Sequence, residues 1–158
     1  MTDTYGRSIQ LGASRRRYED AQALQNAGRW NGAIYLAGYA IECSLKSLIC
    51  YNEGKKNTFK ETKMWDDPSK RGAALHNLES LIKAASLVSL LEESGVKKKI
   101  ALDRTGSLKR AWTTVKDSWK KDERRYGNKV GVQSECERFM ADVKVLYSYI
   151  LEQQGEFL

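Results

Sequence analysis

Residues 32–49 read GAIYLAGYAIECSLKSLI, and this stretch decides the fold. Apolar residues recur in it every three or four positions, which is typical of a helix, and they cover most of its circumference. Glu42 and Lys46 interrupt the run near its centre. Charges there would be costly in lipid, and the apolar length falls below the roughly 20 residues that a membrane span needs. The stretch therefore predicts a buried core helix, and no membrane contact is expected.

Helical spacing continues on both sides of this stretch. Residues 14–28 form a helical pattern that stops at Gly28, a common residue just past a helix end. Apolar residues between 75 and 95 fit one helix with a break near Ser86 or two short helices, and residues 96–118 fit one or two more. The expected core residues of the later helices are Leu78, Leu81, Ile82, Ala85, Ile100, Leu102, Leu108, Trp112, Val115, Cys136, Met140, Val143, Leu146 or Tyr147, and Ile150.

Two further segments have local signals of their own. Residues 52–71 are polar and contain Gly54 and Pro68, which predicts a long exposed loop. Ser134 and Glu137 match the capping box, in which each side chain accepts a hydrogen bond from the other residue's amide, so we expect the last helix to begin at Ser134. No segment alternates strictly between polar and apolar residues, and we expect no sheet.

The composition suits one globular domain. The chain has 158 residues, of which 41% are hydrophobic and 30% are charged, which is ordinary for a soluble protein with a core of its own. We predict a single all-α domain over residues 1–158, with its core at about 14–153. Two long antiparallel helices near the N-terminus and one long closing helix form the expected bundle.

Cysteine and histidine usage limits the chemistry. Cys43, Cys50 and Cys136 are an odd number without a Cys-x-x-Cys pair, which argues against a disulfide framework or a zinc site. We expect small buried residues rather than reactive thiols. His76 is the only histidine, so we expect no metal site and no cofactor. The N-terminus lacks a basic stretch followed by an apolar one, and we expect a cytoplasmic protein.

Three motifs follow one another along the chain. The first runs from Ala27 to Ile49 and contains Ala40-Ile41-Glu42 followed by Leu45-Lys46; the second is His76-Asn77-Leu78-Glu79-Ser80-Leu81; the third is the pair Arg125-Tyr126. In this order they resemble the HEPN domains, which are small helical domains of prokaryotes and some eukaryotes, often linked to nucleotides or RNA. The resemblance covers roughly residues 14–153. It implies a bundle of four or five helices, often a homodimer.

The resemblance also implies two classes of function. Some members are ribonucleases, commonly toxins or defence effectors, with an Arg-x4–6-His motif at a site between two protomers. Others lack that motif and accompany nucleotidyltransferases or act as binding and adaptor modules. Arg71 and His76 fit Arg-x4-His literally, but in the nucleases the motif lies in or near the last long helix. We therefore interpret this match as a coincidence and expect His76 to cap or pack the start of its helix.

Glu42 and Lys46 are the candidate polar site on the central helix. They are four residues apart, so they share a helix face and can pair. One interpretation is a partly buried ion pair with a structural role, since unpaired buried charges cost several kcal/mol. The other places both side chains, with Arg125 and Tyr126, around a pocket that receives a nucleotide or an RNA phosphate.

The net charge of +7 is concentrated in one segment. Residues 97–129 contain twelve Lys or Arg against four Asp or Glu, a pattern that suits either a phosphate backbone or a solvated face. Trp112, Trp119 and Tyr126 lie among them and could stack on bases, unless Trp112 belongs to the core. The candidate RNA-binding or nucleotide-binding residues are Glu42, Lys46, Lys97, Lys98, Lys99, Lys109, Arg110, Lys120, Lys121, Arg124, Arg125 and Tyr126.

Three hypotheses about function follow. The first is a non-catalytic module that binds RNA, a nucleotide or an antitoxin-like partner in a toxin–antitoxin or defence system. The second is a metal-independent endoribonuclease, with Arg71 and His76 or a set including Arg125 and Tyr126 supplying the acid, the base and the cation that RNA cleavage needs. The third is a structural subunit that docks a nucleotidyltransferase.

Overall fold

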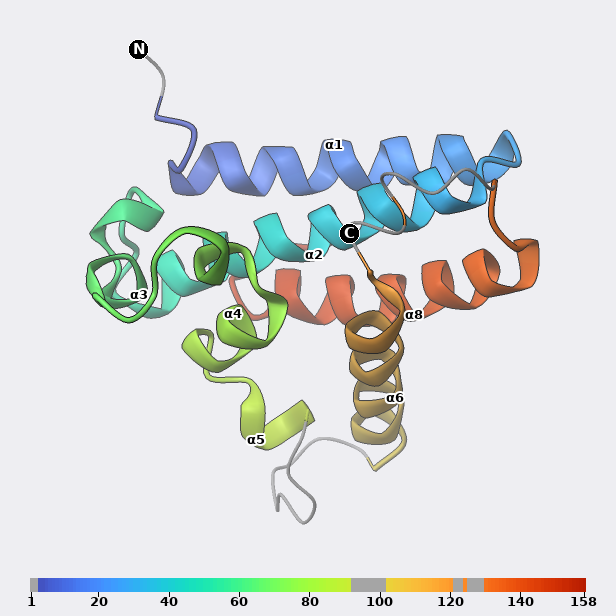
Figure 1. Ribbon diagram of the computed structural model, residues 1–158. Helices are drawn as coiled ribbons and strands as arrows, with labels where there is room; N and C mark the ends of the chain where they lie inside the picture. Colours follow the sequence, from blue (N-terminus) through green and yellow to red (C-terminus); the bar gives the residue numbers. More distant parts are fainter. Residues whose placement is uncertain (1–2, 92–101, 121–123, 125–129) are drawn as a thin grey trace.

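The computed structural model describes residues 3–91, 102–120, 124 and 130–158. Within these residues the regular structure is helical, apart from one isolated bridge between Gly6 and Thr58, so the predicted all-α class is confirmed. Figure 1 shows the helices α1 (Arg7–Asn26), α2 (Trp30–Asn52), α3 (Lys63–Asp66), α4 (Leu78–Ala84), α5 (Val88–Leu91), α6 (Leu102–Ser118) and α8 (Gln133–Glu152), with short 3-10 turns η1 (Phe59–Glu61) and η2 (Gly72–His76).

The three long helices lie side by side (Figure 1). α1 and α2 form the predicted antiparallel hairpin, and Gly28, with φ at +73°, makes the turn between them. α8 packs against α2 and runs parallel to it. At the start of α2 the Asn31 amide donates to the Val130 carbonyl, just before α8, at 2.8 Å. At the other end the Ser47 hydroxyl donates to Gln154, just past α8, at 2.9 Å.

The second helix is the centre of the fold. It packs against α1, α4 and α8, and Ile34, Ile41 and Leu45 on it are fully buried. By length and composition α2 could cross a membrane, but 78% of its apolar window is buried inside the protein. Burying each large aliphatic side chain contributes about 1.5–3 kcal/mol. The prediction of a core helix is confirmed.

The expectation of a long exposed loop over residues 52–71 is wrong in part: most of the segment is exposed or half-buried, but it is not a loop throughout. It contains η1 and α3, and Phe59 and Thr62 in it are fully buried. The ring of Phe59 stacks near that of Tyr5, with centroids 6.3 Å apart, and Trp65 meets Tyr5 edge-on at 5.0 Å. Tyr5, Phe59 and Trp65, which are distant in sequence, therefore pack together and attach this polar segment to the residues before α1. α1 itself begins at Arg7, earlier than the helical pattern from residue 14 indicated.

The predicted capping box is also wrong. α8 begins at Gln133, and its N-cap, Val132, makes no side-chain capping bond. A capping box occurs instead at η1, where the Thr58 hydroxyl accepts from the Lys60 amide and Glu61 accepts from the Thr58 amide. The helix itself buries the expected stripe. The core residues that are buried as predicted include Leu81, Ile82, Leu108, Trp112, Val115, Cys136, Met140, Val143, Leu146, Tyr147 and Ile150; Ile100 and the side chain of Leu102 lie outside the described residues.

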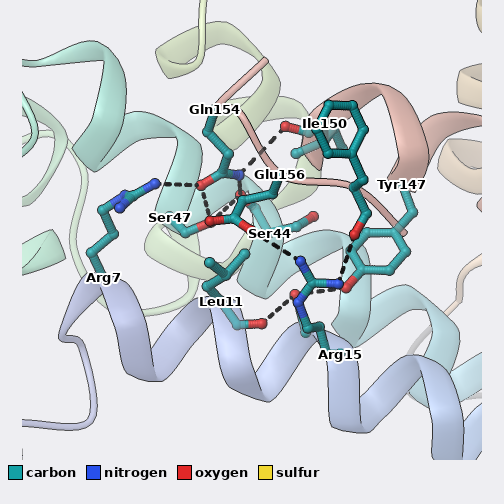
Figure 2. A network of polar contacts seen from close by, with 11 residues as sticks. Arg7, Leu11, Arg15, Ser44, Ser47, Tyr147, Ile150, Gln154 and Glu156 are labelled. Atoms are coloured by element: carbon teal, nitrogen blue, oxygen red, sulfur yellow. Dashed lines mark hydrogen bonds and ion pairs between the residues drawn. The ribbon is translucent and has the colours of Figure 1, made fainter. Parts of the chain in front are cut away.

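A buried polar network joins the three long helices (Figure 2). Gln154 is 3% exposed; its oxygen accepts from Ser47 and from Arg7 at 2.9 and 3.3 Å, and its amide donates to the Ser44 carbonyl at 3.3 Å. Nearby, Arg15 on α1 donates to the Phe157 carbonyl at 2.9 Å. Buried polar groups need hydrogen-bond partners. Sliding one of the three helices along the others would break these bonds, so the network favours one relative position of α1, α2 and α8.

Gly38 on α2 is required by a close approach. A Cβ added there would lie 1.9–2.3 Å from the indole ring of Trp119. That ring is held in place because its Nε1 donates to the Tyr35 carbonyl at 3.1 Å and its plane meets the Tyr39 ring edge-on at 5.2 Å. Trp119, just after α6, can therefore pack against α2 in this position only because residue 38 has no side chain.

We predict that Gly38→Ala destabilises the protein by about 1–3 kcal/mol, because the methyl group overpacks the contact with Trp119. The matched control is Gly106→Ala in α6, where an added Cβ meets nothing within 4 Å and alanine should stabilise the helix by about 1 kcal/mol. Urea denaturation measures both. A neutral Gly38→Ala would show that Trp119 does not pack on this helix.

Candidate functional site

Glu42 and Lys46 form a buried ion pair. Lys46 Nζ lies 3.0 Å from Glu42 Oε2, and the side chains are 3% and 5% exposed, respectively. The pairing expected from their spacing is confirmed. Removing two charges from water costs several kcal/mol for each ion, so the pair needs good geometry and further hydrogen bonds.

His76 supplies one of these further contacts. It ends η2, and its Nδ1 lies 2.9 Å from Lys46 Nζ and 3.2 Å from Glu42 Oε2. Its side chain is 39% exposed, so it connects the buried pair to the surface. It does not cap α4, since Asn77 does so by accepting from the Ser80 amide at 3.0 Å. His76 instead packs on α2, thirty residues away along the chain.

Aromatic rings enclose the ammonium group of Lys46. Its Nζ lies 5.5 Å from the centroid of the Tyr5 ring and 5.8 Å from that of Phe59, distances at which a cation is attracted to a ring face. Both rings belong to segments in which sequence periodicity predicted no structure. Lys46 thus lies among Glu42, His76 and two aromatic rings.

The contacts of His76 determine where its protons lie. An ammonium group donates hydrogen bonds and cannot accept them, so Nδ1 accepts from Lys46 when the ring is neutral. The proton of the neutral ring is then on Nε2, on the side away from the ion pair. When the ring is protonated, Nδ1 carries a hydrogen as well and faces the oxygen of Glu42. Nε2 therefore carries a hydrogen in both states, which makes it a donor and not a general base.

His76 lines a cavity of about 240 Å³ between η2, the start of α4 and the end of α6. Lys116 and Glu79 bring one positive and one negative charge to its wall. Trp119 contributes to the wall but is only 7% exposed. The lining is completed by Ala73, Asn77 and Leu78.

The tryptophan residues do not offer the stacking surfaces considered from the sequence. Trp112 is 1% exposed and belongs to the core. Trp119 is buried over Gly38, with its ring nitrogen bonded to the Tyr35 carbonyl. Both rings are too buried for a base to cover a face of either.

The predicted basic residues are dispersed. Lys109 and Lys116 lie two helical turns apart on α6 and so share a face; Lys120 follows the end of the helix and is exposed. Arg110 is 71% exposed and lies 3.8 Å from Asp142 on α8. The remaining candidates, Lys97, Lys98, Lys99, Lys121, Arg125 and Tyr126, lie outside the described residues.

Arg124 holds several elements together. Its guanidinium donates to Asn31 Oδ1 at 2.8 Å and to the Ser118 carbonyl at 3.1 Å, and it forms an ion pair with Glu135. Its side chain is 12% exposed. These contacts join the beginnings of α2 and α8 to the end of α6. The predicted contact of Arg124 with RNA therefore has little structural support, since the group is already committed to the fold.

Arg71 does not share the cavity with His76. It is the exposed residue before η2 and is not part of the cavity wall, whereas His76 turns towards α2. The structure thus gives no support to a joint role for the Arg-x4-His match. Among the described residues no group of three acidic, cysteine or histidine side chains could hold a metal ion.

Comparison with family models, with curated proteins and with solved structures gives no match. The resemblance to the HEPN domains therefore stays an inference from the three motifs, two of which, around Glu42–Lys46 and around His76, meet at this site.

We predict that Lys46→Met destabilises the protein by about 3–5 kcal/mol, because Glu42 loses its nearest cation while it remains buried. The double variant Glu42→Leu/Lys46→Met should be more stable than Lys46→Met alone, since no uncompensated carboxylate remains. Chemical denaturation of both variants tests the coupling. Losses that simply add would show that the two side chains contribute independently.

Thiol chemistry gives a pH-dependent prediction. Burial raises the pKa of Cys50 and of Cys136 to about 11, so the folded thiols stay protonated at pH 9. Iodoacetamide should therefore label them slowly in the native protein and quickly in urea. Above pH 9 the unfolded chain releases these protons before the folded chain does, and stability should fall as pH rises towards 11. Rapid labelling of the native protein would contradict the buried placement.

Proposed function

We propose that this protein is a HEPN-like module that binds RNA or a nucleotide through a phosphate group, at the cavity between His76 and Lys116, without cleaving it. The observation that carries the proposal is that His76 and Lys116 line the same cavity. Phosphate oxygens accept hydrogen bonds and attract cations. An imidazole and a lysine on the wall of one small cavity match that chemistry.

The endoribonuclease hypothesis has less support. Glu42 and Lys46 are too deeply buried to contact a ribose, and Nε2 of His76 carries a hydrogen in both protonation states. Cleavage would need a base at the 2′-hydroxyl, and no described side chain in the cavity wall other than Glu79 could take that role. Binding therefore fits the described residues better than catalysis does.

A homodimer, a cytoplasmic location, an antitoxin-like partner and docking to a nucleotidyltransferase stay predictions. Each follows from the HEPN resemblance or from the composition rather than from a contact in the fold. Sedimentation of the purified protein would test the dimer directly.

The proposal predicts a salt-sensitive mobility shift of total tRNA or mixed RNA, without cleavage, in the presence of a chelator. Lys116→Gln should weaken the shift several-fold because it removes a cation from the cavity wall. Lys144→Gln is the matched control, since Lys144 is an exposed lysine of α8 that lines a different cavity, beside α1, and its removal should have a smaller effect.

Two outcomes would overturn the proposal. Cleavage by the native protein but not by His76→Ala would establish the nuclease instead. Equal weakening by Lys116→Gln and Lys144→Gln would show that RNA is attracted only by the net positive charge and not by this cavity.

A further inference from the structure

A second cavity, of about 480 Å³, lies where the ends of α2 and α4 meet α3. It shares no lining residue with the cavity next to His76. Its volume is within the range that small ligands occupy in proteins. The polar and charged wall residues that matter for binding are Asn52, Glu53, Lys63, Asp67, Lys70 and Lys83.

Two adjacent residues at the end of α2 hold the walls of this second cavity in place. Glu53 Oε1 accepts a hydrogen bond from the Lys63 amide at 3.0 Å, which attaches the start of α3. The side-chain amide of Asn52 donates to the Ala85 carbonyl at 3.2 Å, which attaches the end of α4. Because both walls are bonded to α2, the cavity is formed before a ligand arrives, and a preformed site costs less ordering on binding.

Three lysines from different segments line the second cavity. Lys63 is the first residue of α3, Lys70 lies in the loop after it, and Lys83 lies in the last turn of α4. Within the described part of the chain, none of the three forms an ion pair. Lys63 and Lys83 are exposed and Lys70 is half-buried, so the flexible stem of each lysine lets its ammonium group turn towards a ligand.

The two carboxylates of the second cavity are engaged by the protein itself. Glu53 accepts from the Lys63 amide, and Asp67 Oδ1 accepts from the Ser69 amide at 2.9 Å and from the Ser69 hydroxyl at 2.7 Å. The wall thus combines three cations with two carboxylates that already accept hydrogen bonds. This excess of positive charge, supplied from three segments, favours a ligand with several negative charges.

We propose that the second cavity binds an oligophosphate, a chain of two or more linked phosphate groups, through Lys63, Lys70 and Lys83. Ammonium groups form charge-assisted hydrogen bonds with phosphate oxygens. A chain of phosphates can contact lysines of separate segments, whereas a single phosphate group would have to draw them together. The inference goes beyond the function proposed above and concerns a different cavity, so either can fail without the other.

Calorimetry at low salt with a chelator compares tripolyphosphate, ATP and inorganic phosphate. Tripolyphosphate should bind more tightly than inorganic phosphate, because it reaches more than one lysine. ATP identifies the source: binding at least as tight as that of tripolyphosphate indicates the phosphates of a nucleotide, and weaker binding indicates a free oligophosphate. Absence of tripolyphosphate binding, or an affinity no higher than that of inorganic phosphate, would overturn the inference.

Substitutions of opposite sign test the contacts. Lys63→Gln, Lys70→Gln and Lys83→Gln should each weaken tripolyphosphate binding several-fold. Asp67→Asn keeps an oxygen that accepts from the backbone but removes a negative charge, so it should strengthen binding. Lys144→Gln is the matched control, since Lys144 is exposed and lines a different cavity. Equal weakening by all four lysine variants would show attraction by net charge alone and would overturn the inference.

Lysine acetylation read by mass spectrometry locates the ligand in the native protein. Saturating tripolyphosphate should slow the acetylation of Lys63, Lys70 and Lys83 and leave that of Lys144 unchanged. Protection of Lys116 in place of these three would put the ligand in the other cavity and contradict the assignment.

Discussion

The ion pair between Glu42 and Lys46 is the constraint on which much of the fold depends. Two charges on the most buried helix are tolerated only if their surroundings supply compensating contacts. Those contacts come from three places in the chain: Tyr5 before α1, Phe59 in η1 and His76 at the end of η2. The pair therefore attaches segments with little helical structure of their own to the central helix.

The same constraint shapes the candidate site. The carboxylate and the ammonium group are enclosed, and the more exposed imidazole ring of His76 lies against both of them. Lys46 donates to Nδ1 of the neutral ring, so the hydrogen of that ring is on Nε2. In the proposed site, the charged pair would therefore support the ring of His76, and the group that meets a ligand would come from a different segment.

Helical periodicity was sufficient to predict α2, the α1–α2 hairpin and the buried stripe of α8, because each depends on residues close together in the chain. It did not predict residues 52–71, whose burial depends on single aromatic residues packing against Tyr5. Spacing also predicted the pairing of Glu42 with Lys46. It could not show that Lys116 and His76 line one cavity, nor that Arg124 is held by Asn31 and Glu135, since both depend on how distant elements pack.

The parallel arrangement of α2 and α8 has a consequence for how the chain folds. Ser47 and Gln154 are 107 residues apart, and contacts this distant in sequence form late because the loop between them must close first. The α1–α2 hairpin, in contrast, needs only a short turn. At a synthesis rate of about 5–20 residues per second, α8 is made several seconds after α2. During this time the apolar side of α2 that α8 later covers is exposed, and it can aggregate or bind a chaperone.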